Sequence, residues 1–254
     1  MAENKTVHRL NTVDNAISLL SLFLKYDTIG LMDIEKETGI SKTAAFRLAV
    51  TLADRGILIK DAKTKLYSPG PLLLQIVRRS QTNDIVTIAQ SYLQELAEIT
   101  KESVYLSIRS GNKYIYLSGI DSNQFLKVSI PCGDELDLHF GAAGKLHMAY
   151  MADSDIDTYF KRNNIGTLGG KNTDHFRNQL EAIKQRGYSL SLGESYAESS
   201  GIVTPIWGMG EEPAATIGIY LPTSRLTSTL EQRFIDLALT FSKRIGKEIK
   251  NRHQ

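Results

Sequence analysis

Hydrophobic positions recur at helical spacing in two short segments near the start of the chain, one on each side of Gly39. Ile34 precedes this glycine, and Ala45 and Leu48 follow it. Such spacing allows two short helices to cross and pack against each other. A glycine at the end of the first helix permits the left-handed backbone that a sharp turn needs. The pattern therefore predicts a helix-turn-helix over residues 30–58.

The second helix of this motif is predicted to have an inward apolar face and an outward polar face. Ser41 is placed to cap its start by accepting a hydrogen bond from an early backbone N–H. The outward face combines cations, a hydroxyl and an aromatic ring, which are groups that contact phosphates and base edges in the DNA major groove. These residues are Lys42, Thr43, Phe46 and Arg47. We interpret the motif as a DNA-binding element; a helix pair that touches no nucleic acid is the alternative.

An apolar stripe in the segment that begins at Thr12 predicts a further helix before the motif. The stripe consists of Val13, Ile17, Leu20 and Leu24. We expect this face to be buried against the two helices of the motif. The preceding residues, 1–11, are expected to form a mobile arm whose Lys5, His8 and Arg9 are available to a phosphate backbone.

Two short strands are predicted after the motif, over 57–61 and 65–68, with a turn between them. Three helices followed by a basic hairpin form a winged helix. Lys60, Lys63 and Lys65 would line the wing and contact phosphates or an adjacent minor groove. A solvated turn that happens to hold three lysines is the alternative.

Pro69-Gly70-Pro71 separates this head from the rest of the chain. Helical spacing then resumes in 71–82, which we expect to be a linker helix, and again in 84–100. Both segments have apolar residues on more than one face, which indicates burial by a partner as well as by their own domain.

The hydrophobic period changes to two after Ser103, and the second half of the chain mixes strands and helices. Strands are predicted at 103–111, 111–121, 124–130, 188–192, 201–207 and 214–222. Helices are predicted at 140–152, 153–162, 172–187 and 227–249. Strands, then helices, then strands and a closing helix indicate an α+β domain with a mostly antiparallel sheet.

Composition fits this organisation. The 254 residues are 42% hydrophobic and 23% charged, as expected for a soluble protein of one large or two ordinary domains. No apolar run is long enough to span a membrane, no signal-peptide core is present, and Cys132 is the only cysteine, so we expect a cytoplasmic protein. Residues 1–80 hold 12 Lys and Arg against 8 Asp and Glu, whereas the remainder has a net charge of −2. A basic excess in the head suits nucleic-acid binding.

Catalytic and metal-binding patterns are missing from the sequence. His139 and His147 have no partner at ligand spacing, and no local signature activates Cys132. We therefore expect no enzyme, no cofactor and no metal. The small residues at 141–145 would let backbone N–H groups approach an anion at a helix start, or would serve close helix-on-sheet packing instead. A Ser- and Gly-rich stretch over 193–204 is a candidate loop over a pocket.

Several short motifs occur in a fixed order along nearly the full chain. They are GISKTAAFRLAVTLADRGIL, LYSPGPLLLQI, YIYLSGIDS, LHFGAAGK, IKQRGYSLSLGE, TPIW and PAATIGIYLPTSRLT. In this order and spacing the chain resembles the IclR family of bacterial transcription regulators. The resemblance implies a winged helix-turn-helix over 1–70, a linker helix over 71–82 and a GAF-like effector-binding domain over 83–254.

The resemblance also implies the site residues. DNA contacts would come from Ser41, Lys42, Thr43, Phe46 and Arg47, with Lys63 and Lys65 on the wing. The effector pocket would be lined by Ala142, Ala143, Ser191, Gly201, Gly218 and Tyr220. The family usually has His or Tyr where Phe46 stands and a cysteine where Gly201 stands, so we expect a different operator and a different effector here.

These features together predict a homodimeric or tetrameric regulator, which we favour as a repressor, bound to a pseudo-palindromic double-stranded DNA operator. A small organic effector, a small carboxylate or a sugar acid, would modulate this binding, and no membrane would be involved. The rival interpretation is a small-molecule-binding protein or enzyme whose winged helix mediates protein contacts.

Overall fold

A computed structural model describes residues 10–78, 81–165, 173–194 and 198–252. The chain divides into two compact units, Met1–Asn83 and Asp84–Gln254, and the described residues of each have their own hydrophobic core. No helix within these ranges is long and apolar enough to cross a membrane. The expected arm with Lys5, His8 and Arg9 lies outside the described residues.

The first unit is the predicted winged helix. Its elements are α1 (Asn11–Ser21), η1 (Leu22–Leu24), α2 (Leu31–Thr38), α3 (Lys42–Asp54), β1 (Leu58–Lys60), β2 (Tyr67–Pro69) and α4 (Pro71–Arg78). Gly39 ends α2 with a φ of 71°, in the left-handed region that glycine favours. Ser41 caps α3 by accepting a hydrogen bond from the N–H of Ala44 at 3.5 Å. The helix-turn-helix prediction is confirmed.

The predicted wing is present as the antiparallel pair β1 and β2, in which Leu58 lies opposite Pro69. Its turn is organised by Asp61, whose carboxylate accepts hydrogen bonds from the N–H groups of Lys63 at 2.9 Å and Thr64 at 2.6 Å. These bonds lower the pKa of Asp61, so the carboxylate stays ionised and keeps accepting them. The hairpin is therefore fixed by one side chain at its tip.

The prediction for the apolar face of the segment that begins at Thr12 is wrong for three of its four residues, whereas Leu20 is partly buried against the core as predicted. Val13, Ile17 and Leu24 are exposed at 50%, 56% and 69%. The core side of this segment is instead formed by Leu19 and Leu22, which are buried. The segment carries two apolar stripes, and helical spacing alone does not say which of them packs inward.

The second unit is an α+β domain, as predicted. Its helices are α5 (Gln81–Thr100), α6 (Gly141–Ala149), α7 (Asp153–Arg162), α8 (Thr173–Arg186) and α9 (Ser228–Arg252), with the 3₁₀ turn η3 (Thr223–Arg225). Its strands are β3 (Ser103–Ser110), β4 (Lys113–Ile120), β5 (Glu135–Asp137), β6 (Ser189–Leu192), β7 (Ser199–Trp207) and β8 (Pro213–Pro222). They form one antiparallel sheet in the order β5-β4-β3-β8-β7-β6.

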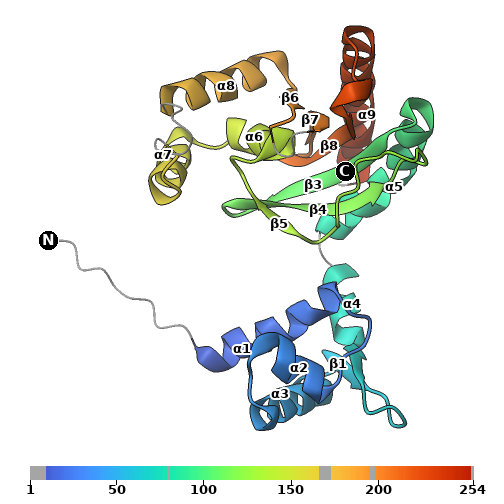
Figure 1. Cartoon of the computed structure of the whole chain (residues 1–254), viewed down its shortest axis with the longest axis vertical. Helices are drawn as coiled ribbons and strands as arrows, with labels where there is room; N and C mark the ends of the chain where they lie inside the picture. Colours follow the sequence, from blue (N-terminus) through green and yellow to red (C-terminus); the bar gives the residue numbers. More distant parts are fainter. Residues whose placement is uncertain (1–9, 79–80, 166–172, 195–197, 253–254) are drawn as a thin grey trace, which may run out of the picture. The chain divides into compact units, whose positions relative to one another are not determined.

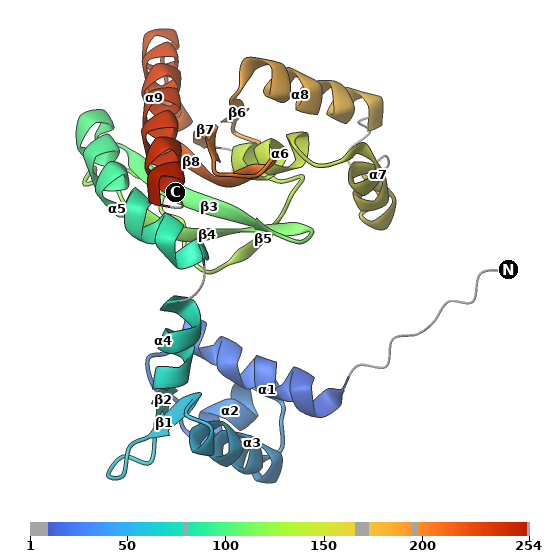
Figure 2. The ribbon, with the colours of Figure 1, turned by 180° about the vertical axis from the view of Figure 1, so that it is seen from behind.

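Helices cover this sheet on both faces. The α5 and α9 helices lie side by side on one face, and α6, α7 and α8 lie on the other (Figures 1 and 2). Alternate residues of β3 belong to different cores: Val104 and Leu106 pack beneath α5 and α9, whereas Tyr105 packs on the α6 side. This period of two is expected for a strand buried on both faces.

The segment predicted as a strand at 124–130 is not a strand. It is irregular, and Phe125 at its start is fully exposed. The strand beside β4 is instead β5, where the sequence analysis predicts no strand, and Tyr114 of β4 lies opposite Leu136. The alternation of Leu126, Val128 and Ile130 misled the prediction, because these side chains line a cavity rather than a sheet face.

Candidate DNA-binding and effector-binding sites

The α3 helix presents all of its predicted DNA-binding residues on its exposed side. Ala45 and Ala49 are fully buried against the winged-helix core. The solvent side carries Ser41, Lys42, Thr43, Phe46 and Arg47. Phe46 leaves 47% of its surface exposed, so its ring is available for an apolar contact. The face thus offers two cations, hydroxyls and an apolar ring together.

Sequence reasoning missed Glu35 of α2, whose carboxylate lies at the start of α3. Its carboxylate accepts a hydrogen bond from the backbone N–H of Lys42 at 3.3 Å, which ties α2 to the first turn of α3. An acidic group at this position also suits the positive end of the helix dipole. The pairing joins residues across the turn, so no periodic pattern in the sequence indicates it.

The wing lysines differ in what they contact. Lys63 and Lys65 are exposed on either side of the tip of the hairpin. The ammonium of Lys60 lies 5.3 Å from the ring centroid of Tyr67, a cation–π contact within the hairpin itself. Lys63 and Lys65 are therefore the wing cations best placed for phosphate contacts.

A cavity of about 640 Å³ lies in the second unit, on the α6 side of the sheet. Its lining comes from β4, β7 and β8, from the start of α6, and from the irregular segment 126–131. A cavity of this size is in the range of small-molecule sites.

Only some of the predicted pocket residues line this cavity. Ala142, Ser191, Gly201 and Tyr220 belong to the lining, whereas Ala143 and Gly218 do not. Ala143 is 1% exposed and packs in the core beside α6. Gly218 lies beneath the ring of Tyr220, which separates it from the cavity.

Sequence reasoning missed Tyr114 and Tyr116, which line the cavity from β4. Both are buried, at 2% and 4% exposure, whereas Ile115 between them and Leu117 after them are only partly buried. In β4 the buried face carries tyrosines rather than aliphatic residues, which indicates that the interior beside it is polar. The alternation of tyrosine with aliphatic residues in the sequence already contained this signal.

The buried part of the lining, here called the cavity floor, is uncharged and rich in hydroxyls. It consists of Tyr114, Tyr116, Gly141, Ala142, Ser191, Ser200, Gly201, Tyr220 and Pro222. The ionisable side chains of the lining, Lys127, Asp134 and Glu198, are exposed at the rim. The floor therefore offers neutral hydrogen-bond donors and no buried counter-charge.

The α6 helix contributes its first residues, Gly141 and Ala142, to the cavity. No side chain caps this helix, so its first N–H groups are available to an acceptor. Gly144 allows the close approach that places the helix here, because a Cβ atom on it would lie 2.5 Å from the carbonyl oxygen of Leu138.

The wall segment 126–131 is held by side chains instead of a strand ladder. Asp121 is paired with Lys127 at 3.0 Å and accepts a hydrogen bond from Ser129 at 2.8 Å. The hydroxyl of Tyr105 donates to Asp121 and accepts from the N–H of Ile130 at 2.8 Å. These bonds to the carboxylate lower the pKa of Asp121 and offset the effect of its partial burial.

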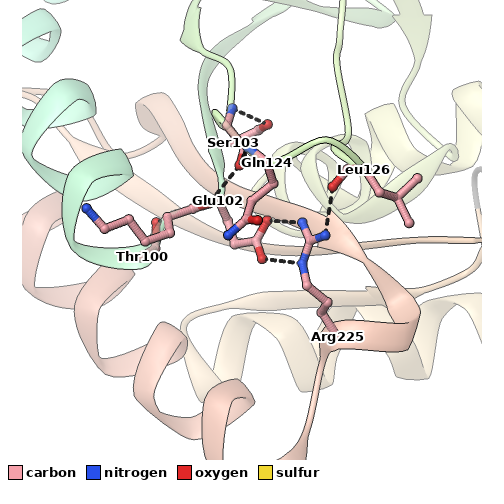
Figure 3. A network of polar contacts seen from close by, with 8 residues as sticks. Thr100, Glu102, Ser103, Gln124, Leu126 and Arg225 are labelled. Carbon is pink, nitrogen blue, oxygen red and sulfur yellow. Dashed lines mark hydrogen bonds and ion pairs between the residues drawn. The ribbon is translucent and has the colours of Figure 1, made fainter.

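A second contact fixes the same wall near its start (Figure 3). The guanidinium of Arg225 donates to both carboxylate oxygens of Glu102 and, at 2.7 Å, to the carbonyl oxygen of Leu126. Glu102 is 5% exposed, so this bidentate pair is largely shielded from water. Arg225 also follows the lining residues Thr223 and Ser224, and it thus joins two parts of the cavity boundary.

His139, His147 and Cys132 belong to no group of side chains in the described part of the chain that could hold a metal ion. His147 is buried and its Nε2 atom lies 3.2 Å from the Ser107 hydroxyl, which in turn lies 2.7 Å from Thr216. Burial lowers the pKa of His147 to about 3, so the ring is neutral. Burial also raises the pKa of the Cys132 thiol, the opposite of what a reactive cysteine requires.

The chain combines a winged helix that has an exposed cationic recognition face with a second domain that contains a cavity. This combination is typical of winged-helix regulators that carry a ligand-binding domain. Two family descriptions match this chain: "IclR helix-turn-helix domain" over residues 12–62 and "Bacterial transcriptional regulator IclR C-terminal" over residues 78–247. The chain belongs to the IclR family of bacterial transcription regulators, whose named relatives here are regulators and not enzymes.

Named relatives agree with this assignment. The HTH-type transcriptional regulator KipR of Bacillus subtilis is 29% identical over 92% of this chain and 97% of its own length. The transcriptional repressor IclR of Escherichia coli is 20% identical over 86% of this chain and 82% of its own length. An IclR homologue of Microbacterium hydrocarbonoxydans, solved with 4-hydroxybenzoate, shares the fold with a TM-score of 0.78, at 16% identity over 94% of this chain and 98% of its own.

Proposed function

We propose that this protein is a repressor that binds a pseudo-palindromic DNA operator through α3 and the wing. The observation that carries the proposal is the exposed face of α3, where Lys42, Thr43, Phe46 and Arg47 point to solvent together. Arg47 is placed to contact a base edge and Phe46 to meet a thymine methyl group. Lys63 and Lys65 on the wing would contact phosphates on either side of the recognition helix. Repression is favoured because the E. coli relative is named a repressor.

A second copy of the chain would complete the DNA-binding form. The α1 stripe of Val13, Ile17 and Leu24 is exposed. The α4 helix likewise exposes apolar side chains, Leu74 at 67%, Ile76 at 58% and Val77 at 48%. Burying these surfaces in a homodimer or tetramer would remove apolar area from water and place two recognition helices on two half-sites.

The cavity would bind a small organic effector, and we propose a small carboxylate or a sugar acid. Support comes from the neutral hydroxyl-rich floor and the uncapped start of α6, which together favour one anionic group without a buried cation. The apolar wall residues Val128, Ile130 and Leu136 would cover the body of the ligand. The Microbacterium relative with bound 4-hydroxybenzoate is an example of such a ligand in this family.

Effector binding would act on the operator by changing the population of head orientations. We assign 1–70 to the DNA-binding head, 71–82 to the linker helix and 83–254 to the effector domain, acting in the cytoplasm. The ligand can shift this equilibrium only to the extent that it binds the two states with different affinity.

Selection of DNA from a pool of random duplexes by the purified protein tests the proposal. After several rounds, the sequenced pool is expected to be enriched in a pseudo-palindrome whose half-sites are about one helical turn apart, or a multiple of that. A variant with Lys42, Thr43, Phe46 and Arg47 all replaced by alanine is the control and should enrich nothing. If the wild-type protein also enriches nothing, the winged helix serves protein contacts and the proposal fails.

A further inference from the structure

The start of the recognition helix carries an acidic group, although the head holds more cationic than acidic residues. Glu35 belongs to α2 and is exposed. Its carboxylate reaches across the turn and accepts a hydrogen bond at 3.3 Å from the backbone N–H of Lys42, the first residue of α3. A negative charge is therefore held beside the residues that are proposed to contact DNA.

This charge is not neutralised by a neighbouring cation. Within the described residues, no Lys or Arg side chain forms an ion pair with Glu35. Asp33 of the same helix has a different task, because it accepts a hydrogen bond from the N–H of Gly30 at 2.8 Å and so caps α2 itself. A glutamine at position 35 could accept the bond from Lys42 without any charge, so the hydrogen bond alone does not require a carboxylate.

The carboxylate stands where a phosphate would otherwise be attracted. The first N–H groups of a helix and the positive end of its dipole favour a bound anion. In α3 two of these N–H groups already donate to the protein, that of Lys42 to Glu35 and that of Ala44 to the Ser41 hydroxyl. Electrostatic screening at physiological salt acts over about 8 Å, which exceeds one helical turn, so Glu35 would repel a phosphate placed at this end.

Repulsion at this position affects two modes of DNA binding differently. Non-specific binding consists almost entirely of phosphate contacts, whereas operator binding adds contacts to base edges. In the operator complex of a helix-turn-helix protein, the first residues of the recognition helix face bases. A carboxylate beside these residues therefore penalises a complex in which α3 rests its first turn on the phosphate backbone.

We infer that Glu35 determines DNA specificity: its charge keeps phosphates away from the start of α3 and so reserves Lys42 and Thr43 for base edges. The inference rests on the proposed function, in which α3 reads an operator. It adds that α2 contributes to the choice of DNA through a repulsive group, in addition to the attractive groups on α3.

Fluorescence anisotropy of the full chain tests the inference, with the duplex recovered from the selection experiment and a scrambled duplex as probes. Glu35→Gln removes the charge and keeps an acceptor for the N–H of Lys42. It should strengthen binding to the scrambled duplex roughly three- to ten-fold and change binding to the selected duplex by less than about two-fold. Glu37→Gln is the matched control, since it makes the same change at another exposed position of α2. It should leave the ratio of the two affinities as it is in the wild type.

Glu35→Asp separates the charge from the hydrogen bond, because it keeps the carboxylate on a shorter side chain, and it should retain the wild-type ratio. An unchanged ratio in Glu35→Gln, or the same fall in Glu37→Gln, overturns the inference and leaves the repressor function standing. Weaker binding of Glu35→Gln to the selected duplex also overturns it, since the carboxylate would then contact a base. A wild-type protein that does not prefer the selected duplex contradicts the repressor function itself.

Discussion

At the scale of single residues, Arg47 is expected to contact a DNA base and Lys63 a DNA phosphate. Arg47 lies on the recognition face of α3, and Lys63 lies at the tip of the wing. Replacing Arg47 by alanine should weaken binding to a selected operator by about 1–3 kcal/mol and should relax its sequence preference. Lys63→Ala should weaken binding to operator and scrambled duplexes alike. Fluorescence anisotropy with both duplexes measures this, and equal behaviour of the two variants would contradict the assignment of Arg47 to a base.

His147 makes stability depend on pH. Its pKa is lowered to about 3 by burial and, to a lesser extent, by Arg109. Between pH 6.5 and pH 3 the unfolded chain binds a proton that the folded chain does not, so the free energy of unfolding falls as the pH falls. The contribution from this one residue is about 2 kcal/mol between pH 7 and pH 5.

Urea unfolding at the two pH values measures this effect against a His147→Gln variant. The loss of stability on going from pH 7 to pH 5 should be smaller in the variant, because glutamine does not titrate. The same loss in both proteins would mean that His147 does not remain neutral in the folded state.

At the scale of elements, we make a prediction about what holds the wall segment 126–131 in place. Asp121 holds this segment through Lys127 and Ser129 and through the hydroxyl of Tyr105, where a strand would use backbone pairs. Asp121→Asn removes the ion pair and weakens these hydrogen bonds, so backbone amides of the wall should exchange with deuterium faster. Glu95→Gln is the control, because it breaks a carboxylate–arginine pair on α5 and α9 instead. Unchanged exchange in the wall of Asp121→Asn would show that the carboxylate does not hold it.

The same segment shows what the sequence could and could not reveal about elements. Periodicity found every α-helix of the described structure and most of its strands, because α-helices and doubly buried strands leave long, regular patterns. It placed a strand at 124–130 because Leu126, Val128 and Ile130 alternate there, although they face a cavity. Periodicity also placed the exposed residues Val13, Ile17 and Leu24 on the core side of the first helical segment. The spacing of an exposed apolar stripe is the same as that of a buried one. The pairing of Tyr220 on β8 with Gly201 on β7 depends on the register between these strands, which the sequence does not state.

The exposed stripe of α1 leads to a prediction for the whole molecule. If a second copy covers this stripe, Ile17→Asp should shift the protein from dimers or tetramers toward monomers, because a carboxylate would have to be buried in the interface. Met32→Asp is the matched control, since Met32 on α2 is more exposed still, at 74%, and lies outside the stripe. Sedimentation velocity measures the oligomeric state. A monomeric wild-type protein, or an unchanged state in Ile17→Asp, would contradict this account of the stripe.

For the whole molecule, we propose that a basic head binds a specific operator and that a small carboxylate in the second unit modulates this binding. The most direct test of this account is the operator affinity of the wild-type protein, measured over a series of salt concentrations with the selected duplex and with a scrambled one. The account predicts that log Kd rises steeply and linearly with log salt for both duplexes, as phosphate contacts require, with the selected duplex bound at least about a thousand-fold more tightly throughout. Binding that does not depend on salt, or equal affinity for the two duplexes, would contradict it.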